Sequence, residues 1–177
     1  TWAPTDSLII GGSITTLDFA YGAFTAACTG DQDVAYRAAR PATWPSTPAG
    51  RAARQCTQDL AGKAGNFAPE TSASMYANYF TSMSGGSELV YTIAANYVSE
   101  FNSTGVADPA ADHDASTKID LNVRLMMENG LEIKLFGKNV TDEIVGSSSL
   151  ALPLTPGSFF KLWEPGKQFG ISIRKTF

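Results

Sequence analysis

The chain has 177 residues, a length that fits one domain or part of a larger one. Charged residues make up only 17% of it, against roughly 25% in common soluble domains. The chain contains no apolar run of the roughly 18 residues that a membrane-spanning helix needs, and a net charge of −4 argues against a nucleic-acid partner.

Six segments have the composition of β-strands, and they are joined alternately by long and by tight connections. The tight connections are Ser84–Ser87 and Glu128–Gly130, and the second contains an Asn-Gly pair suited to a hairpin turn. The long connections cover residues 25–71, 102–117 and 141–166. In chain order, the strands are expected at Ser7–Phe24, Ser72–Met83, Glu88–Phe101, Lys118–Met127, Leu131–Val140 and Lys167–Phe177.

The first of these strands is less regular than the others. The residues before it, Thr1–Asp6, read as a turn. The stretch Leu8–Gly12 does not alternate between apolar and polar residues, which predicts a β-bulge at this point.

The other strands alternate strictly between apolar and polar residues. In the last strand, Phe169, Ile171 and Ile173 share one face, while Ser172 and Arg174 share the other. A soluble sheet can use this pattern, and a tilted strand of about ten residues crossing a bilayer requires it. We expect one face to contact lipid, through Leu121, Val123, Ile133, Ile171 and Ile173. Aromatic girdles are expected at two rims, with Tyr91 and Phe177 at one and Tyr97, Phe101 and Phe169 at the other.

The sorting of the connections by length favours a membrane barrel over a soluble sandwich. Outer-membrane barrels have short periplasmic turns and long external loops. With the C-terminus in the periplasm, both tight turns fall on the periplasmic side and all long connections fall outside. The fold class that follows is all-β, an antiparallel up-and-down transmembrane barrel segment.

Three stretches resemble the C-terminal end of a TonB-dependent outer-membrane receptor. They are Asn66–Tyr76 with its Ala-Pro-Glu, Leu131–Glu143 with its Gly-Lys-Asn-Val-Thr-Asp, and Glu164–Phe177 with its alternating run that ends in phenylalanine. The resemblance implies a barrel of about 22 strands that encloses an N-terminal plug domain. Residues 1–177 are then expected to be the C-terminal part of that barrel, without the plug, since membrane barrels have at least about eight strands.

The resemblance also implies a function and a set of partners. The chain would form barrel wall and external loops of an active-transport receptor for a scarce solute, of the siderophore, vitamin or glycan class. Its partners would be outer-membrane lipid and lipopolysaccharide, the plug and remaining strands, and an energy-transducing inner-membrane complex that acts through the plug. We expect no cofactor and no enzymatic activity. The alternatives are a soluble β-sandwich binding module and an outer-membrane enzyme barrel.

Cys28 and Cys56 lie in the first long connection, a polar and proline-rich stretch. In an exported protein, an even number of cysteines predicts a disulfide, here one that closes an external loop. The alternative is a pair of free thiols.

The candidate ligand contacts lie in the long connections. Arginine is suited to bidentate contact with phosphate or carboxylate groups, such as those of lipopolysaccharide or an anionic ligand; ordinary loop charge, balanced by Asp31, Asp33 and Asp59, is the alternative. Aromatic residues of the third connection, Phe159, Phe160 and Trp163, form either a ligand platform or part of a girdle. The candidate contacts are Arg37, Arg40, Arg51, Arg54 and Trp163.

The remaining polar residues do not predict catalysis. The single histidine, His113, lies between Asp112 and Asp114, and we expect it at a solvated loop tip because no second histidine exists to complete a metal site. Four charged residues on strands are expected to line a wet lumen, where they pair across strands or with the plug: Asp120, Arg124, Glu132 and Lys134.

Overall fold

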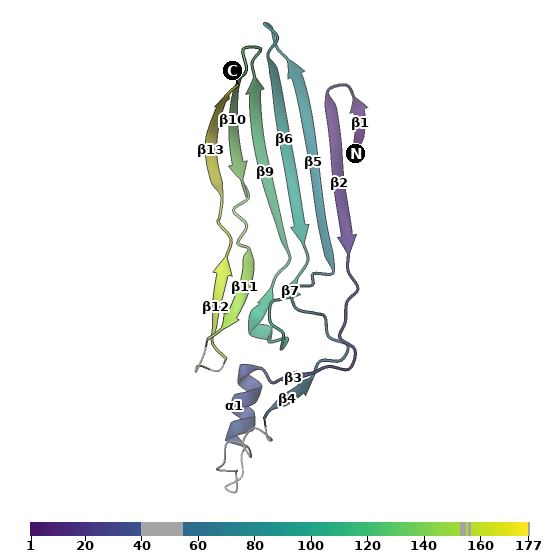
Figure 1. The fold of residues 1–177 in the computed structure, drawn as a ribbon, viewed down its shortest axis with the longest axis vertical. Helices are drawn as coiled ribbons and strands as arrows, with labels where there is room; N and C mark the ends of the chain where they lie inside the picture. The colour runs from purple at the N-terminus through teal and green to yellow at the C-terminus, as the bar shows by residue number, and fades with distance from the viewer. Residues whose placement is uncertain (40–54, 153–154, 156, 177) are drawn as a thin grey trace.

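A computed structural model describes residues 1–39, 55–152, 155 and 157–176. Its main element is a seven-stranded sheet in the order β1-β2-β5-β6-β9-β10-β13, in which every neighbouring pair is antiparallel (Figure 1). The all-β fold class is therefore confirmed. The strands are β1 (Trp2–Thr5), β2 (Leu8–Thr16), β5 (Thr71–Ser82), β6 (Glu88–Val98), β9 (Ser116–Met126), β10 (Leu131–Lys138) and β13 (Gln168–Lys175).

Each of the six expected strands corresponds to a strand of this sheet, and one expectation at the N-terminus is wrong. The Thr1–Asp6 stretch is not a turn, because Trp2–Thr5 forms a seventh strand paired with β2. The expected irregularity at Leu8–Gly12 lies in the pairing with β1, where the register shifts between Trp2 and Thr5, whereas β2 pairs with β5 in continuous register. A Cβ atom on Gly11 would lie 2.5 Å from the ring of Tyr76, so this glycine gives room to a cross-strand tyrosine.

The connections are sorted by length between the two ends of the sheet. Figure 1 shows the tight β5–β6 and β9–β10 turns and the C-terminus at one end, and the long connections at the other. Gly85 and Gly130 adopt positive φ angles of 79° and 77° in these turns, a conformation that glycine reaches without steric cost.

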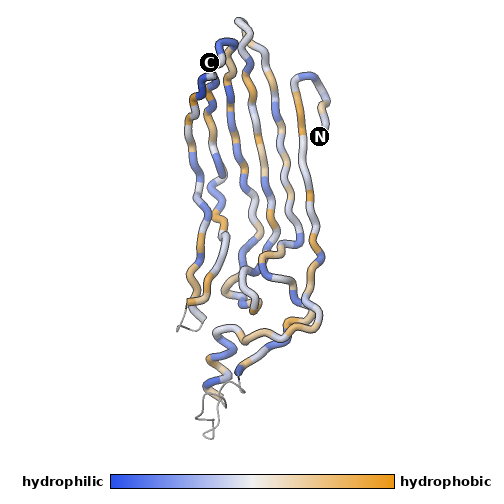
Figure 2. The backbone as a smooth tube through the Cα atoms, viewed as in Figure 1, coloured by the Kyte–Doolittle hydropathy of each residue, from blue (hydrophilic) through white to orange (hydrophobic). Residues whose placement is uncertain are grey.

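The two faces of the sheet differ in polarity, as expected, and Figure 2 shows the alternation along the long strands. We call the side that carries Leu121, Leu135 and Ile171 the apolar face. Cross-strand pairing makes this face continuous: Ile133 lies opposite Leu125 on one side and Ile173 on the other. Several of its large side chains are exposed, with Leu121 at 44% and Ile173 at 67%, while Val123, Leu125 and Ile133 are half-buried. In the described residues, no second sheet of comparable size covers it, since the other sheets are two-stranded.

We call the opposite side of the sheet the polar face. Arg124 lies directly opposite Lys134, whose ammonium group is 5.6 Å from the centroid of the Phe136 ring. Asp120 accepts a hydrogen bond from the backbone N–H of Asn139, at 2.8 Å. Among the described residues, Arg124 takes part in none of the ion pairs, and its Nε and the Oδ1 of Asn122 are buried without a hydrogen-bond partner. The expected cross-strand charge pairing is therefore absent at Arg124.

The long connections contain secondary structure of their own. They hold α1 (Gly30–Ala38), η1 (Pro109–Ala111) and three two-stranded sheets: β3 (Thr25–Ala27) with β4 (Thr57–Asp59), β7 (Phe101–Asn102) with β8 (Asp112–His113), and β11 (Gly146–Ala151) with β12 (Phe159–Trp163). Among the described residues, no helix has the length and apolarity to cross a membrane.

The first and second connections are joined by hydrogen bonds. The side-chain amide of Gln58 donates to the carbonyl oxygens of Ala27 and Val106, at 2.9 and 2.7 Å. The backbone N–H of Gly30 donates to the carboxylate of Asp108, at 3.4 Å. These bonds bring together chain segments far apart in the sequence and build a compact assembly at the loop end of the sheet.

Candidate functional site

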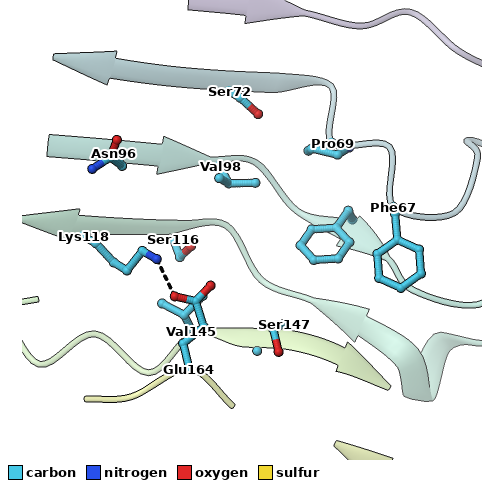
Figure 3. Close-up of a pocket in the computed structure, with 12 residues that line it drawn as sticks. Phe67, Pro69, Ser72, Asn96, Val98, Ser116, Lys118, Val145, Ser147 and Glu164 are labelled. Carbon is cyan, nitrogen blue, oxygen red and sulfur yellow. Dashed lines mark hydrogen bonds and ion pairs between the residues drawn. The ribbon is translucent and has the colours of Figure 1, made fainter. Parts of the chain in front are cut away.

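A cavity of about 310 Å³ lies where the polar face meets the long connections (Figure 3). Its floor is made by three neighbouring strands, because the pairing places Ser72 beside Val98 and Val98 beside Ser116. Two residues further along these strands, and on the same face, Asn96 of β6 lies beside Lys118 of β9. The remaining lining comes from the connections: Phe67, Pro69, Phe101, Val145, Gly146, Ser147 and Glu164.

An ion pair joins the floor of the cavity to its opposite wall. The ammonium group of Lys118, on β9, contacts the carboxylate of Glu164, which follows β12 (Figure 3). Both side chains are about one-third exposed, at 32% and 35%. Among the described residues of the lining they are the only charged ones, so the charge of this part of the cavity is balanced.

Phe67 stands at the cavity in an unusual backbone conformation. Its φ angle is 52°, in the left-handed region that bulky residues rarely adopt. A hydrogen bond from its backbone N–H to the carbonyl oxygen of Asn102, at 2.8 Å, contributes to holding it there. The residue is 52% exposed, and its ring lies 6.1 Å from that of Phe101, centroid to centroid. Such strain costs on the order of 1–3 kcal/mol and concentrates at ligand and active sites.

His113 supports the cavity wall from behind and is not a solvated loop tip. It is 5% exposed and stacks on Phe101 with ring centroids 4.9 Å apart. Its Nε2 lies 3.0 Å from the hydroxyl of Ser103 and 3.2 Å from that of Ser149. A Cβ atom on Gly146 would lie 2.3 Å from its Nδ1, so only glycine fits there without rearrangement. The histidine therefore joins the second connection to the third.

The environment of His113 favours its neutral form. Burial is the largest cause of its lowered pKa, followed by the positive charge of Lys161. The carboxylates of Asp112 and Asp114 act in the opposite direction and raise the pKa. The net pKa lies below the ordinary value of 6.5.

We expect acidification to weaken the packing around His113. The unfolded loop binds a proton on this imidazole more readily than the folded loop, so stability present above pH 6.5 is lost as pH falls through the lowered pKa. Hydrogen–deuterium exchange of the segment 101–113, corrected for intrinsic rates, should show less protection at pH 5 than at pH 7.5. His113→Asn does not titrate and should remove most of this difference. A difference that persists in this variant would assign it to another group.

The two sequence-predicted ligand contacts that the structure describes, Arg37 and Trp163, do not line the cavity. Arg37, at the end of α1, forms an ion pair with Asp33 at 2.6 Å. Trp163, on β12, is exposed and lies outside the lining. Phe160 is also exposed outside it. Arg40, Arg51 and Arg54 lie outside the described residues.

Sequence reasoning missed the residues that do line the cavity. Three of them, Phe67, Pro69 and Ser72, stand in the Asn66–Tyr76 stretch, to which the sequence analysis assigned no ligand contact. The available signal was a group of small polar residues and one lysine at the loop end of the polar face, namely Ser72, Ser116 and Lys118. The contact of Lys118 with Glu164 depends on how the third connection folds back.

The disulfide between Cys28 and Cys56 is confirmed, with Cα atoms 5.4 Å apart. Cys28 follows β3 and Cys56 precedes β4. The backbone N–H of Cys28 also donates to the carbonyl oxygen of Cys56, at 3.2 Å. The bond thus closes the base of the segment that begins with α1.

Fold and cavity together define an all-β protein with one open antiparallel sheet, whose polar face ends in a cavity. No protein-family model, no curated protein and no solved structure matches the chain. Any assignment to a family therefore depends on the sequence motifs alone, and function has to be argued from the two faces of the sheet and from the cavity.

Proposed function

We propose that the chain forms barrel wall and external loops of an active-transport receptor, of the TonB-dependent type, in a Gram-negative outer membrane. The observation that carries the proposal is the exposed apolar face of the seven-stranded sheet. An apolar surface of this size is not stable in water, whereas a bilayer is its matching solvent. The resemblance of three stretches to TonB-dependent receptors supplies the family.

The dimensions of the strands support the membrane assignment. β5 has 12 residues, and β6 and β9 have 11 each. A tilted strand needs about 9–11 residues to cross the hydrocarbon core. The polar face would line the lumen, and the connections with the cavity would lie at its outer mouth. The proposal assigns no catalytic step to any side chain.

The edges of the sheet support a larger assembly. β1 and β13 are its outermost strands and are not paired with each other. Unpaired backbone groups cost several kcal/mol each in lipid, so further strands are expected between these two edges. A plug inside the barrel would meet the polar face, where Asn122 and Arg124 have buried atoms without partners. An inner-membrane complex would supply energy through that plug.

A soluble β-sandwich is the alternative from another class. A sandwich buries its apolar face beneath a second sheet, with the two sheets about 10 Å apart. In the described part of the chain the other sheets are two-stranded, and Figure 1 shows them beyond the loop end of the main sheet. This arrangement favours the barrel.

We expect the two ends of the sheet to lie on opposite sides of the outer membrane. Two exposed positions allow a matched test: Gly105 in the second long connection and Ser84 in a tight turn. An impermeant maleimide applied to intact cells should label Gly105→Cys, and should label Ser84→Cys only after the outer membrane is permeabilised. The two native cysteines form the disulfide and do not react with the maleimide. The protein without an added cysteine therefore gives the background labelling.

Two results would count against the proposal. Labelling of Ser84→Cys, but not Gly105→Cys, on intact cells would reverse the orientation. Recovery of the protein as a soluble monomer without detergent would remove it from the membrane and favour the sandwich.

A further inference from the structure

The lining of the cavity offers unused hydrogen-bonding groups. Asn96, Ser72 and Ser116 extend from three neighbouring strands into the cavity (Figure 3). Their side chains make no hydrogen bond within the described part of the chain, whereas the hydroxyl of Ser147 donates to the carbonyl oxygen of Leu162. A ligand there would find an amide and two hydroxyls, each able to donate and to accept.

The charge of the described lining does not favour strongly charged ligands. Among the described lining residues, Lys118 is the one cation, and its ammonium group is already paired with Glu164. Recognition of an anionic metal chelate or a phosphate requires unpaired cations, most often arginines. The part of the lining that the structure describes contains no arginine. A neutral ligand with many hydroxyl groups suits the Lys118–Glu164 pair. Its hydroxyls can donate to the carboxylate of Glu164 and accept from the ammonium group of Lys118.

The aromatic side of the cavity adds a second requirement. Phe67 is held in a strained conformation that leaves the residue half exposed, beside the ring of Phe101, which His113 supports from behind. A half-exposed ring offers an apolar surface to a flat apolar ligand face. Pyranose rings have such a face, made of C–H groups, and carry hydroxyls around their edge.

We propose that this cavity binds a neutral glycosyl unit of an oligosaccharide, stacked on Phe67 and hydrogen-bonded to Asn96, Ser116 and the Lys118–Glu164 pair. The volume of about 310 Å³ is at the lower end of the roughly 300–1,000 Å³ typical of small-molecule sites, which fits a small saccharide unit. The inference rests on the proposed function, and it selects the glycan class among the solutes of such a receptor.

The test uses the full-length protein, purified from outer membranes in detergent. Calorimetric titration is performed with three neutral trisaccharides (maltotriose, cellotriose and xylotriose) and with two charged probes, trigalacturonate and a ferric tris-catecholate. We expect at least one neutral trisaccharide to bind, and neither charged probe.

Variants then locate the bound saccharide. Phe67→Ala should weaken its binding about tenfold or more, because the stacking surface is lost. Asn96→Ala should weaken it about fivefold through a lost hydrogen bond. Phe67→Trp keeps an aromatic ring and should retain binding. The matched control is Phe160→Ala, which removes the ring of a residue of similar exposure, 54% against 52%, outside the cavity.

The outcomes separate this inference from the receptor proposal. Absence of binding to all three trisaccharides, or binding that Phe67→Ala and Phe160→Ala weaken equally, would overturn the glycan inference. Binding of the ferric tris-catecholate instead would overturn it and leave the receptor proposal in place. A protein that is soluble without detergent, yet binds a trisaccharide through Phe67, would overturn the receptor proposal alone.

Discussion

Arginine in place of Leu121 is expected to lower the free energy of unfolding in a bilayer by about 2–4 kcal/mol. Leu121 lies at the middle of β9, on the apolar face, between Ile93 of β6 and Gly137 of β10. Its side chain is 44% exposed. In a barrel this surface meets hydrocarbon near the bilayer midplane, where a guanidinium group loses its hydration.

The next residue gives the control for this substitution. Asn122 has the same depth in the sheet and faces the opposite side, so Asn122→Arg should cost much less than Leu121→Arg. Urea titration of each variant in liposomes, followed by tryptophan fluorescence, measures both costs. Equal costs would mean that the two faces do not meet different solvents, and the membrane assignment would fail.

Loss of the Cys28–Cys56 disulfide is expected to destabilise the first long connection by roughly 3 kcal/mol. The bond joins residues 28 positions apart, and opening it gives the enclosed segment many more conformations in its unfolded state. The sheet itself should change little, because the bond lies beyond its loop end. Limited proteolysis of Cys28→Ser/Cys56→Ser should show faster cleavage within residues 29–55, with the strands intact.

A reductant provides the control for the disulfide variant. Dithiothreitol should raise the cleavage rate of the native protein to that of the double variant and should leave the variant unchanged. Equal cleavage of the native protein and the double variant without reductant would show that the bond contributes nothing to this loop. Non-reducing peptide mass spectrometry confirms the state of the bond in each sample.

Six strands of the main sheet and its two faces follow from local patterns in the sequence. Alternation with a period of two is a local property, so Leu121 and Ile171 could be assigned to the apolar face without knowledge of any contact. The Asn-Gly pair at Glu128–Gly130 specified a tight turn for a similarly local reason. The disulfide was predicted from an even number of cysteines in one polar stretch of an exported protein.

Where the sequence failed, pairing between strands was decisive. Trp2–Thr5 reads as a turn because four residues with a proline carry little alternation, and only the pairing with β2 makes them a strand. Gly11 lies opposite Tyr76, a residue far along the chain whose ring needs the space that a Cβ atom would fill. No pattern within Leu8–Gly12 shows that partner.

The cavity was decided by tertiary structure alone. His113 reads as exposed between two aspartates, yet it is buried by Ser149, a residue 36 positions away. Lys118 and Glu164 are 46 positions apart and meet because the third connection folds back over β9. Strand register and loop packing depend on such long-range contacts, whose formation the periodicity of one segment does not encode. The sequence therefore predicts which side of the sheet is polar, and the packing of the loops sets where on that side the cavity lies.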